Sequence, residues 1–309
     1  MFFCKQFFNR SMTAEVEWPV PHGASLMENH MQEIYIKKQT LEAWLKQVGS
    51  LVVAFSGGVD STFLLAVAAN VIADTGKLLA VTETSPLHAG ADVAFARSFA
   101  ATLNIRHVSI DAGMLIDREF AANPPNRCYL CKHAVLRRII DAAANHGIHH
   151  VAHGVNVDDL GDFRPGMAAA KELNVHAPLL EAGFTKKDIR RLSRQMGLPT
   201  WNKPSSGCMA TRIPYGQPID LHKIQAIAAS EAFLRNLGFG DCRVRHYGEL
   251  AKIEVSIRDA DRLRAPGIRY RIIKAFREIG FLYVSLDLEG FGSGRLNRSI
   301  ASETPKGQN

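Results

Sequence analysis

The sequence predicts an α/β protein with a doubly wound, mainly parallel sheet and a smaller C-terminal α+β domain. Between residues 51 and 155, short apolar segments alternate with helical segments, which is typical of parallel βαβ units. After residue 217 the order becomes helix, strand, strand, helix, strand, which indicates an α+β unit. With 309 residues, the chain is long enough for two domains. The predicted divisions are an extension over 1–30, the α/β domain over 31–216, the α+β domain over 217–289 and a loose tail over 290–309.

The first thirty residues do not resemble a folded element. The apolar start, Met1 to Phe8, lacks the long apolar core and the small-residue cleavage site of a signal peptide. Pro19, Pro21 and Gly23 then interrupt any helical pattern. We therefore expect a poorly ordered extension, and the first helix from about Gln32 to Val48.

The first strand leads into a glycine-rich loop. The apolar run Leu51 to Phe55 is followed by Ser56-Gly57-Gly58-Val59-Asp60-Ser61 and then by a helical pattern. A strand, a tight turn and a helix N-terminus direct backbone N–H groups to one point, which suits a phosphate. Gly57 and Gly58 allow a ligand close to the main chain, Ser56 and Ser61 add hydroxyl groups, and Asp60 can bind magnesium. The lysine of the common mononucleotide loop is absent from this motif.

The remaining elements of the α/β domain follow in order. We expect strands at 77–82, 106–110 and 150–155, and helices at 88–103 and 128–146. Ligands of such sheets bind beyond the carboxyl ends of the strands, where the segments 56–61, 82–85 and 154–159 fall. A later helix is predicted from Thr185 to Gly197, with Asp188 placed for a capping box. In the second domain we expect helices at 221–237 and 260–279 and strands at 242–247, 251–257 and 281–286.

Composition limits the classes of function. The net charge of +7 favours anionic partners such as a nucleotide, an acidic small molecule or RNA, although a generally basic surface explains it equally well. No apolar run is long enough to cross a membrane. Five cysteines do not suggest a secreted disulfide framework, so we expect a reducing cytoplasm.

Three cysteines form a possible site. Cys128 and Cys131 make a Cys-x-x-Cys pair at a helix start beside Arg127, and Cys208 lies far along the chain in an irregular stretch. The pair alone is compatible with a redox dithiol, half of a zinc site or part of an iron–sulfur site. If Cys208 joins it, three thiolates can hold a cluster and leave one iron without a protein ligand.

Charged residues downstream supply a candidate anion site. Arg212 follows Cys208 closely, and Arg243 and Arg245 share one face of a strand. Arginines of this kind suit phosphate or carboxylate groups, with Glu231 and Glu254 able to position them, whereas a solvated edge strand is the simpler explanation.

The glycine-rich loop resembles that of the N-type ATP pyrophosphatases, and the motifs together narrow the resemblance. They are Asn-Pro-Pro-x-Arg-Cys-x-x-Cys-Lys from Asn123, Asp-Asp-Leu-Gly-Asp-Phe-Arg-Pro-Gly from Asp158, Lys-Pro-x-x-x-Cys-x-x-x-Arg-Ile-Pro-Tyr-Gly from Lys203, and Arg-Val-Arg-His from Arg243. In this order, over roughly residues 33–288, the chain resembles the LarE family, the sulfur transferases that build the nickel-pincer nucleotide cofactor of lactate racemase. The implied fold of the first domain is the adenine nucleotide α-hydrolase-like fold with its pyrophosphate loop.

The resemblance implies a substrate and a sequence of steps. The substrate is pyridinium-3,5-biscarboxylic acid mononucleotide, a polyanion that suits Arg212, Arg243 and Arg245. ATP with Mg²⁺ adenylates one carboxylate, pyrophosphate leaves, and sulfur then displaces AMP to give a thiocarboxylate. The loop from Ser56 to Ser61 would hold the pyrophosphate, with Mg²⁺ shared with Asp60. Thr82 and Gly154 would flank the adenosine.

The resemblance also implies two possible sulfur sources. One is sacrificial donation from a single cysteine, here Cys208. The other is a 4Fe-4S cluster held by Cys128, Cys131 and Cys208 that carries sulfide from an external source, and the three cysteines favour it. A homo-oligomer is implied as well. Rival interpretations are a tRNA thiolase, an ammonia-using ligase with the same loop and a non-catalytic iron–sulfur sensor; with no recognisable RNA-binding module, we expect no nucleic-acid partner and no membrane partner.

Overall fold

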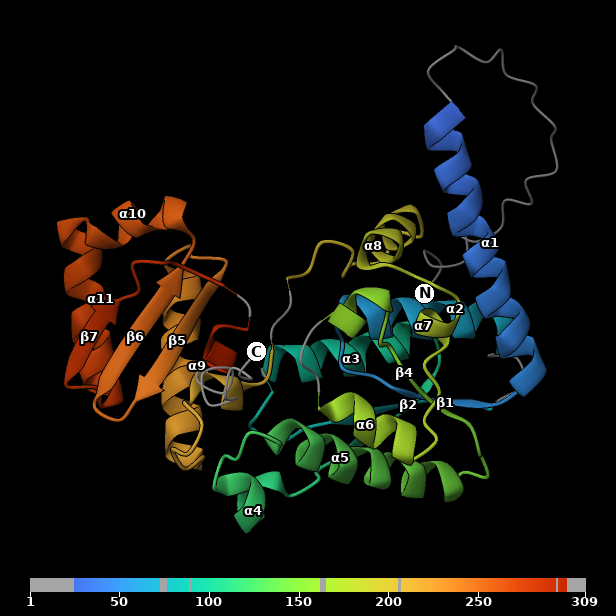
Figure 1. Ribbon diagram of the computed structural model, residues 1–309, viewed down its shortest axis with the longest axis horizontal. Coiled ribbons are helices and arrows are strands. Elements are labelled where there is room, and N and C mark those ends of the chain that lie inside the picture. The colour runs from blue at the N-terminus through green and yellow to red at the C-terminus, as the bar shows by residue number, and fades with distance from the viewer. Residues whose placement is uncertain are drawn as a thin grey trace, which may run out of the picture.

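The computed structural model describes residues 25–72, 77–88, 90–161, 165–204, 207–292 and 294–298. Most of the expected extension and most of the expected tail lie outside these residues. Figure 1 shows two units side by side, one built on the sheet of β1 to β4 and the other on the sheet of β5 to β7.

The larger unit contains a parallel sheet in the order β3-β2-β1-β4. Its strands are β1 (Leu51–Ala54), β2 (Leu78–Glu83), β3 (Arg106–Ile110) and β4 (Val151–His153). β1 lies in the middle, with Val52 opposite Leu79 of β2 and Val151 of β4. The predicted α/β class and parallel sheet are therefore confirmed, and the carboxyl ends of all four strands lie at one edge.

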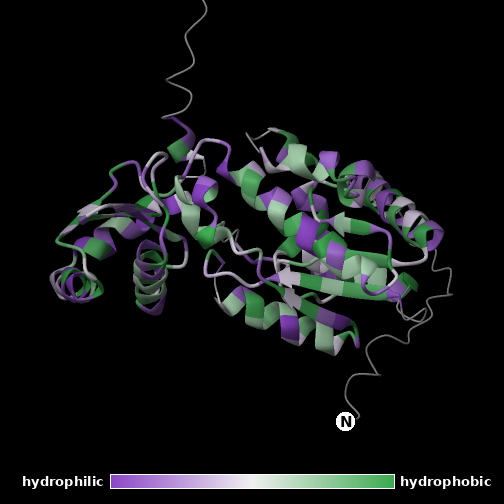
Figure 2. Ribbon diagram, turned by 90° about the horizontal axis from the view of Figure 1, so that it is seen from below, coloured by the Kyte–Doolittle hydropathy of each residue, from purple (hydrophilic) through white to green (hydrophobic). Residues whose placement is uncertain are grey.

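Helices cover both faces of this sheet. α1 (Ser25–Val48), α2 (Val59–Ile72), α3 (Gly90–Thr102) and α8 (Lys186–Gln195) lie on one face, and α5 (Arg127–Ala144) and α6 (Gly166–Glu172) lie on the other. Because strand side chains alternate, Leu51 and Val53 enter the first apolar core while Val52 enters the second. Figure 2 shows the apolar residues concentrated along the strands and the inner helix faces. This packing fixes the strand ends and the helix starts that form the site.

Some boundaries differ from those that the sequence predicts. α1 begins at Ser25 rather than Gln32, because no proline or glycine interrupts the chain after Gly23. α8 has the predicted capping box, in which Thr185 Oγ1 accepts from the backbone N–H of Asp188 at 3.2 Å and Asp188 accepts from that of Thr185 at 3.1 Å. Two short helices, α4 (Arg118–Ala121) and α7 (Pro178–Glu181), were not predicted.

The smaller unit is the expected α+β arrangement. β5 (Cys242–Tyr247) pairs antiparallel with β6 (Leu250–Val255), which pairs parallel with β7 (Tyr283–Leu286), and the helices are α9 (Leu221–Asn236), α10 (Ala260–Arg264) and α11 (Pro266–Ile279). The single helix expected over 260–279 is wrong: Pro266 has no N–H to donate, and Ala265 before it is extended, with φ −54° and ψ 130°.

An apolar cluster packs the two units together. It combines Leu87, Met114 and Phe120 of the larger unit with residues of the following segment and of α9, namely Met209, Ala210, Ile213, Ile219, Ile224 and Ile227. The turn Met209–Arg212, labelled η4, lies within this layer. Among the described residues, no helix has the length and apolarity needed to span a membrane.

Candidate functional site

The glycine-rich loop lies between β1 and α2, and Gly57 is essential to its shape. Gly57 has φ +70°, and a Cβ atom there would lie 2.9 Å from the backbone oxygen of Asp92 and 3.1 Å from Phe95. The N-terminal part of α3 therefore packs directly against the loop. Any other residue at position 57 would strain the backbone and displace this helix.

Gly154 supports the loop from the neighbouring strand end. A Cβ atom at Gly154 would lie 2.8 Å from the backbone nitrogen of Ser61 and 3.0 Å from the carbonyl carbon of Asp60. The chain after β4 thus packs under the first turn of α2. Gly154 does not line the cavity described below, so its direct contact is with the loop.

The polar side chains of the loop are held in place. Ser56 Oγ and Ser61 Oγ lie 3.1 Å apart. Asp60 forms an ion pair with Lys186 and accepts from Asn156 Nδ2 at 3.3 Å. Burial raises the pKa of Asp60, against the opposing effect of Lys186. A divalent cation would replace Lys186 as the positive partner of this carboxylate.

Two lysines from distant segments reach the loop. Lys186 lies at the start of α8, and Lys203 Nζ donates to the backbone oxygen of Gly57 at 2.8 Å while pairing with Asp92 at 2.8 Å. Arg190 donates to the backbone oxygen of Lys203 at 2.8 Å and so fixes that segment. The positive charge that the motif itself lacks is therefore present. In the sequence, Lys203 is marked only by the Lys-Pro motif before Cys208. That motif does not indicate that Lys203 contacts the glycine-rich loop.

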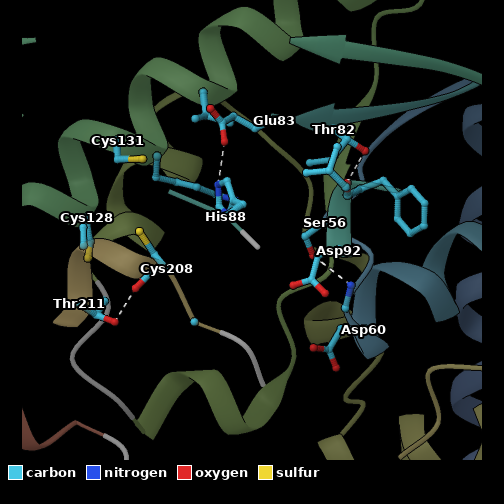
Figure 3. A pocket seen from close by; sticks show the side chains of 18 of the residues that line it. Ser56, Asp60, Thr82, Glu83, His88, Asp92, Cys128, Cys131, Cys208 and Thr211 are labelled. Carbon is cyan, nitrogen blue, oxygen red and sulfur yellow. Dashed lines mark hydrogen bonds and ion pairs between the residues drawn. The ribbon is translucent and has the colours of Figure 1, made fainter. Parts of the chain in front are cut away.

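One cavity of about 440 Å³ connects the loop to the three thiols. Its lining includes Ser56, Gly58 and Asp60 at one end and Cys128, Cys131 and Cys208 at the other. Figure 3 shows the three sulfur atoms grouped on one side, with Ser56, Asp60 and Thr82 on the opposite side. The structure thus brings together the two predicted groups, although about 150 residues separate Ser56 from Cys208 in the chain.

The thiols differ in environment. Cys128 is exposed, whereas Cys131 and Cys208 are partly buried. Burial raises the pKa of the Cys131 thiol strongly, and Cys208 and Glu83 act in the same direction. Burial also raises the pKa of the Cys208 thiol. Among the described residues, no three His, Cys, Asp or Glu side chains converge on a point where they could bind one metal ion. In a cluster each thiolate binds a different iron atom, so the cluster stays a prediction.

A buried arginine joins the segments that carry the thiols. Arg127, next to Cys128, donates to Asn123 and to the backbone oxygen of Ile213 (3.2 Å), and its guanidinium lies 4.1 Å from the ring centroid of Tyr215. Asn123 in turn donates to the backbone oxygen of Pro214 at 2.7 Å. These contacts tie the start of α5 to the chain just after Cys208.

The predicted substrate arginines do not line this cavity. Arg212 pairs with Glu231 at 2.8 Å and Arg245 pairs with Glu254 at 2.8 Å, and all four side chains are almost fully buried. Arg243 donates to the backbone oxygen of Gly292 at 3.1 Å and stacks on a phenylalanine ring. Substrate binding by these five residues stays a prediction, and their observed contacts hold β5, α9 and η4 together.

Several cavity residues were not singled out from the sequence. Thr82, which the sequence did single out, lines the cavity, and its hydroxyl donates to the backbone oxygen of Phe55 at 2.7 Å; its contact with adenosine stays a prediction. Glu83 follows it and pairs with His88 at 2.8 Å. Lys132 lies beside Cys131, and burial lowers its pKa. Only the position of Glu83 at a strand end could have indicated a role.

Comparison with known proteins gives three similar chains, and no family model matches. The chain is 37% identical over 273 residues, 87% of its length and 97% of the relative's, to a pyridinium-3,5-bisthiocarboxylic acid mononucleotide synthase of Lactiplantibacillus plantarum. It is 36% identical over 264 residues, 85% of its length and 98% of the relative's, to an uncharacterized protein of Synechocystis. A protein of Methanocaldococcus jannaschii, also uncharacterized, is 30% identical over 244 residues, which are 79% of this chain and 91% of that one.

Proposed function

The chain belongs to the LarE family, and on that premise we propose that it is an ATP-dependent sulfurtransferase acting on pyridinium-3,5-biscarboxylic acid mononucleotide. It adenylates one carboxylate of the substrate, releases pyrophosphate and replaces the adenylate with sulfur. The observation that carries the proposal is the single cavity that joins the phosphate loop to the three thiols.

The loop end of the cavity provides what adenylation needs. A free carboxylate is a poor electrophile, and transfer of the adenylyl group from ATP converts it into a good one with AMP as the leaving group. The backbone of Gly58 and the first turn of α2 bind phosphate oxygens, and Lys186 and Lys203 offset the charge of the departing pyrophosphate. Asp60 would hold Mg²⁺, and Lys186, which pairs with Asp60 here, would then pair with the phosphates.

The thiol end provides a donor set that fits a 4Fe-4S cluster. Cys128, Cys131 and Cys208 are soft sulfur ligands on one wall of the cavity. Held by these three cysteines, a cluster would have one iron atom without a protein ligand and would supply a place to carry sulfide. Contacts of Arg127 and Asn123 hold the segments that carry the thiols together. The apolar cluster that contains Met209 and Phe120 limits water at this end.

The adenylation step is tested by exchange of labelled pyrophosphate into ATP. We expect exchange that depends on both Mg²⁺ and the biscarboxylate nucleotide, and its loss in Asp60→Asn. An Asp141→Asn variant, on the exposed face of α5, is the matched control and should exchange normally. Exchange without the nucleotide, or with bulk tRNA in its place, would contradict the proposed substrate.

The sulfur source is tested by anaerobic reconstitution with iron and sulfide. We expect a broad visible absorption that each of Cys128→Ser, Cys131→Ser and Cys208→Ser removes, and that Cys242→Ser retains. Cys242 is a suitable control because it is buried in the core of the smaller unit. A colourless protein that reacts once and whose residue 208 has become dehydroalanine would instead identify Cys208 as a sacrificial donor.

A further inference from the structure

A carboxylate and an imidazole form a fixed pair in the wall of the cavity. Glu83, at the end of β2, accepts from the backbone N–H of Ser85 at 3.1 Å and from its hydroxyl at 3.0 Å. The second oxygen of Glu83 also contacts His88 Nε2 at 2.8 Å. The Glu83 side chain is only 8% exposed, whereas that of His88 is 38% exposed. The carboxylate is thus held within the protein, and the imidazole faces the cavity.

The imidazole lies where the two halves of the reaction meet. Figure 3 shows His88 between the sulfur atoms on one side and Ser56 and Thr82 on the other. The turn that carries it is tied to the thiol segment, because the backbone oxygen of Leu87 accepts from the N–H of Met209 at 2.9 Å. A carbonyl group activated at the loop and approached by sulfur from the thiols would pass this side chain.

The pair has the chemistry of an oriented base. Glu83 accepts the proton on Nε2, so the neutral ring has its lone pair on Nδ1. A carboxylate in this position also stabilises the imidazolium once a proton has been taken up. Burial disfavours the charged form of Glu83, but the contacts from His88 and Ser85 outweigh it and keep the pKa of Glu83 low, so the carboxylate stays ionised.

We propose that His88, oriented by Glu83, is the general base of the sulfur-transfer step, an inference that rests on the proposed function. A hydrosulfide, or sulfide delivered with one proton, attacks the carbonyl carbon of the acyl adenylate and the C–S bond forms. His88 Nδ1 takes the proton from that sulfur. The C–O bond to AMP breaks, AMP leaves with the electron pair and needs no proton, and the product is the thiocarboxylate anion. The imidazolium then releases its proton to water.

Removal of this proton decides the direction of collapse. While sulfur keeps its proton, the tetrahedral intermediate can expel hydrosulfide and return to the adenylate. Once deprotonated, the sulfur would have to leave as a dianion, so AMP leaves instead. Adenylation requires no proton transfer, because a carboxylate attacks phosphorus and pyrophosphate departs as an anion. His88 is therefore specific to the second half of the reaction.

The test compares the two half-reactions in His88→Ala and His88→Gln, with His222→Gln on the exposed start of α9 as the control. Nucleotide-dependent pyrophosphate exchange reports adenylation, and thiocarboxylate mass reports sulfur transfer. We expect the ratio of transfer to exchange to fall by about 100-fold in both His88 variants and not in the control. Added imidazole should restore transfer in His88→Ala, whose cavity has room for it, and Glu83→Gln should show a smaller fall.

Other outcomes overturn the inference in distinguishable ways. An unchanged ratio of transfer to exchange would show that His88 is not the base. This holds whether both activities persist or both fall equally without imidazole rescue. Circular dichroism and thermal melting of both variants identify a folding defect. In that case the smaller fall of the transfer-to-exchange ratio in Glu83→Gln, a protein that retains His88, provides the test. Absence of exchange in the unmodified protein would overturn the proposed function itself.

Discussion

Gly154 is the residue whose replacement should separate loop geometry from fold. In Gly154→Ala the new methyl group would meet the backbone of Ser61 and Asp60, so the phosphate-binding turn must shift. We expect ATP affinity to fall by at least about tenfold, because small displacements of binding groups are costly. Titration calorimetry measures it. Gly240→Ala, where a Cβ atom meets nothing within 4 Å, is the control, and equal affinities in the two variants would contradict the packing argument.

The thiols should differ in reactivity in the metal-free protein. Burial raises the pKa values of Cys131 and Cys208, so both stay protonated at mildly alkaline pH, and thiols react far more slowly than thiolates. Burial also raises the pKa of Cys242, to about 11. Among the four cysteines that the structure describes, exposed Cys128 should therefore be alkylated first by iodoacetamide, as peptide mass spectrometry would show. Equal labelling of Cys131 would mean that the thiol end is open to solvent.

Site residues that belong to a sequence motif were predictable. Those that reach the cavity only through folding were not. The loop from Ser56 to Ser61 and the three cysteines were recognised by spacing, and the structure places them around one cavity. Lys186 and His88 are single residues with no local signature, and only the parallel sheet and the packing of α8 bring them to it. Arg212 is predicted to bind substrate, but in the structure it pairs with the buried Glu231. The sequence could not show whether Arg212 would pair with this glutamate or with a substrate.

At the scale of elements, α8 is fixed at its start by Asp188. Burial opposes its ionisation, but Lys37 of α1 and the hydrogen bonds at Thr185 hold the pKa of Asp188 below 3.8. A lowered carboxyl pKa gives stability that is present above the usual value and lost as pH falls through the folded value. Because Lys186 lies in the same first turn, this cap also supports the phosphate site.

We expect Asp188→Asn to lower the free energy of unfolding by about 1 kcal/mol at neutral pH. The difference from the unmodified protein should shrink as the pH falls below 3.8. Urea unfolding at neutral and acid pH measures it, with the exposed Asp141→Asn as the control. A constant difference across this range would show that ionisation of Asp188 contributes nothing.

Element boundaries were predictable where a local signal exists. β3 and β5 begin and end where the apolar pattern predicts, and the capping box places α8. The break at Pro266 is visible in the sequence, although the prediction of one helix over 260–279 does not include it. The short helices α4 and α7 have too few residues to show a period, so they depend on tertiary packing.

At the scale of the whole molecule, a buried ion pair and a hydrogen bond connect the two units. Arg212 of η4 pairs with Glu231 of α9, and Arg245 Nη1 donates to the backbone oxygen of Thr211 at 2.6 Å. η4 directly follows Cys208, so the smaller unit buttresses the thiol end of the cavity. The two sheets were predicted from the sequence, whereas this connection between them was not, because it depends on side chains far apart in the chain.

Removal of one residue of the Arg212–Glu231 ion pair should lower the stability of the protein. We expect Arg212→Met to destabilise the protein by about 3–5 kcal/mol, because the Glu231 charge stays buried without its main partner. The double variant Arg212→Met with Glu231→Met should recover part of that loss. Urea unfolding measures both. An Arg212→Met variant with full stability and weakened binding of the biscarboxylate nucleotide would instead assign Arg212 to the substrate, as its sequence motif suggested.

In the proposed reaction, one cavity activates a carboxylate at its loop end and delivers sulfur from its thiol end. The most direct measurement uses substrate whose carboxylates carry heavy oxygen, incubated with ATP, Mg²⁺ and a sulfide source. We expect one labelled oxygen in the phosphate of AMP for each sulfur atom gained by the substrate. Label in inorganic phosphate, or a thiocarboxylate formed with no label in AMP, would contradict it.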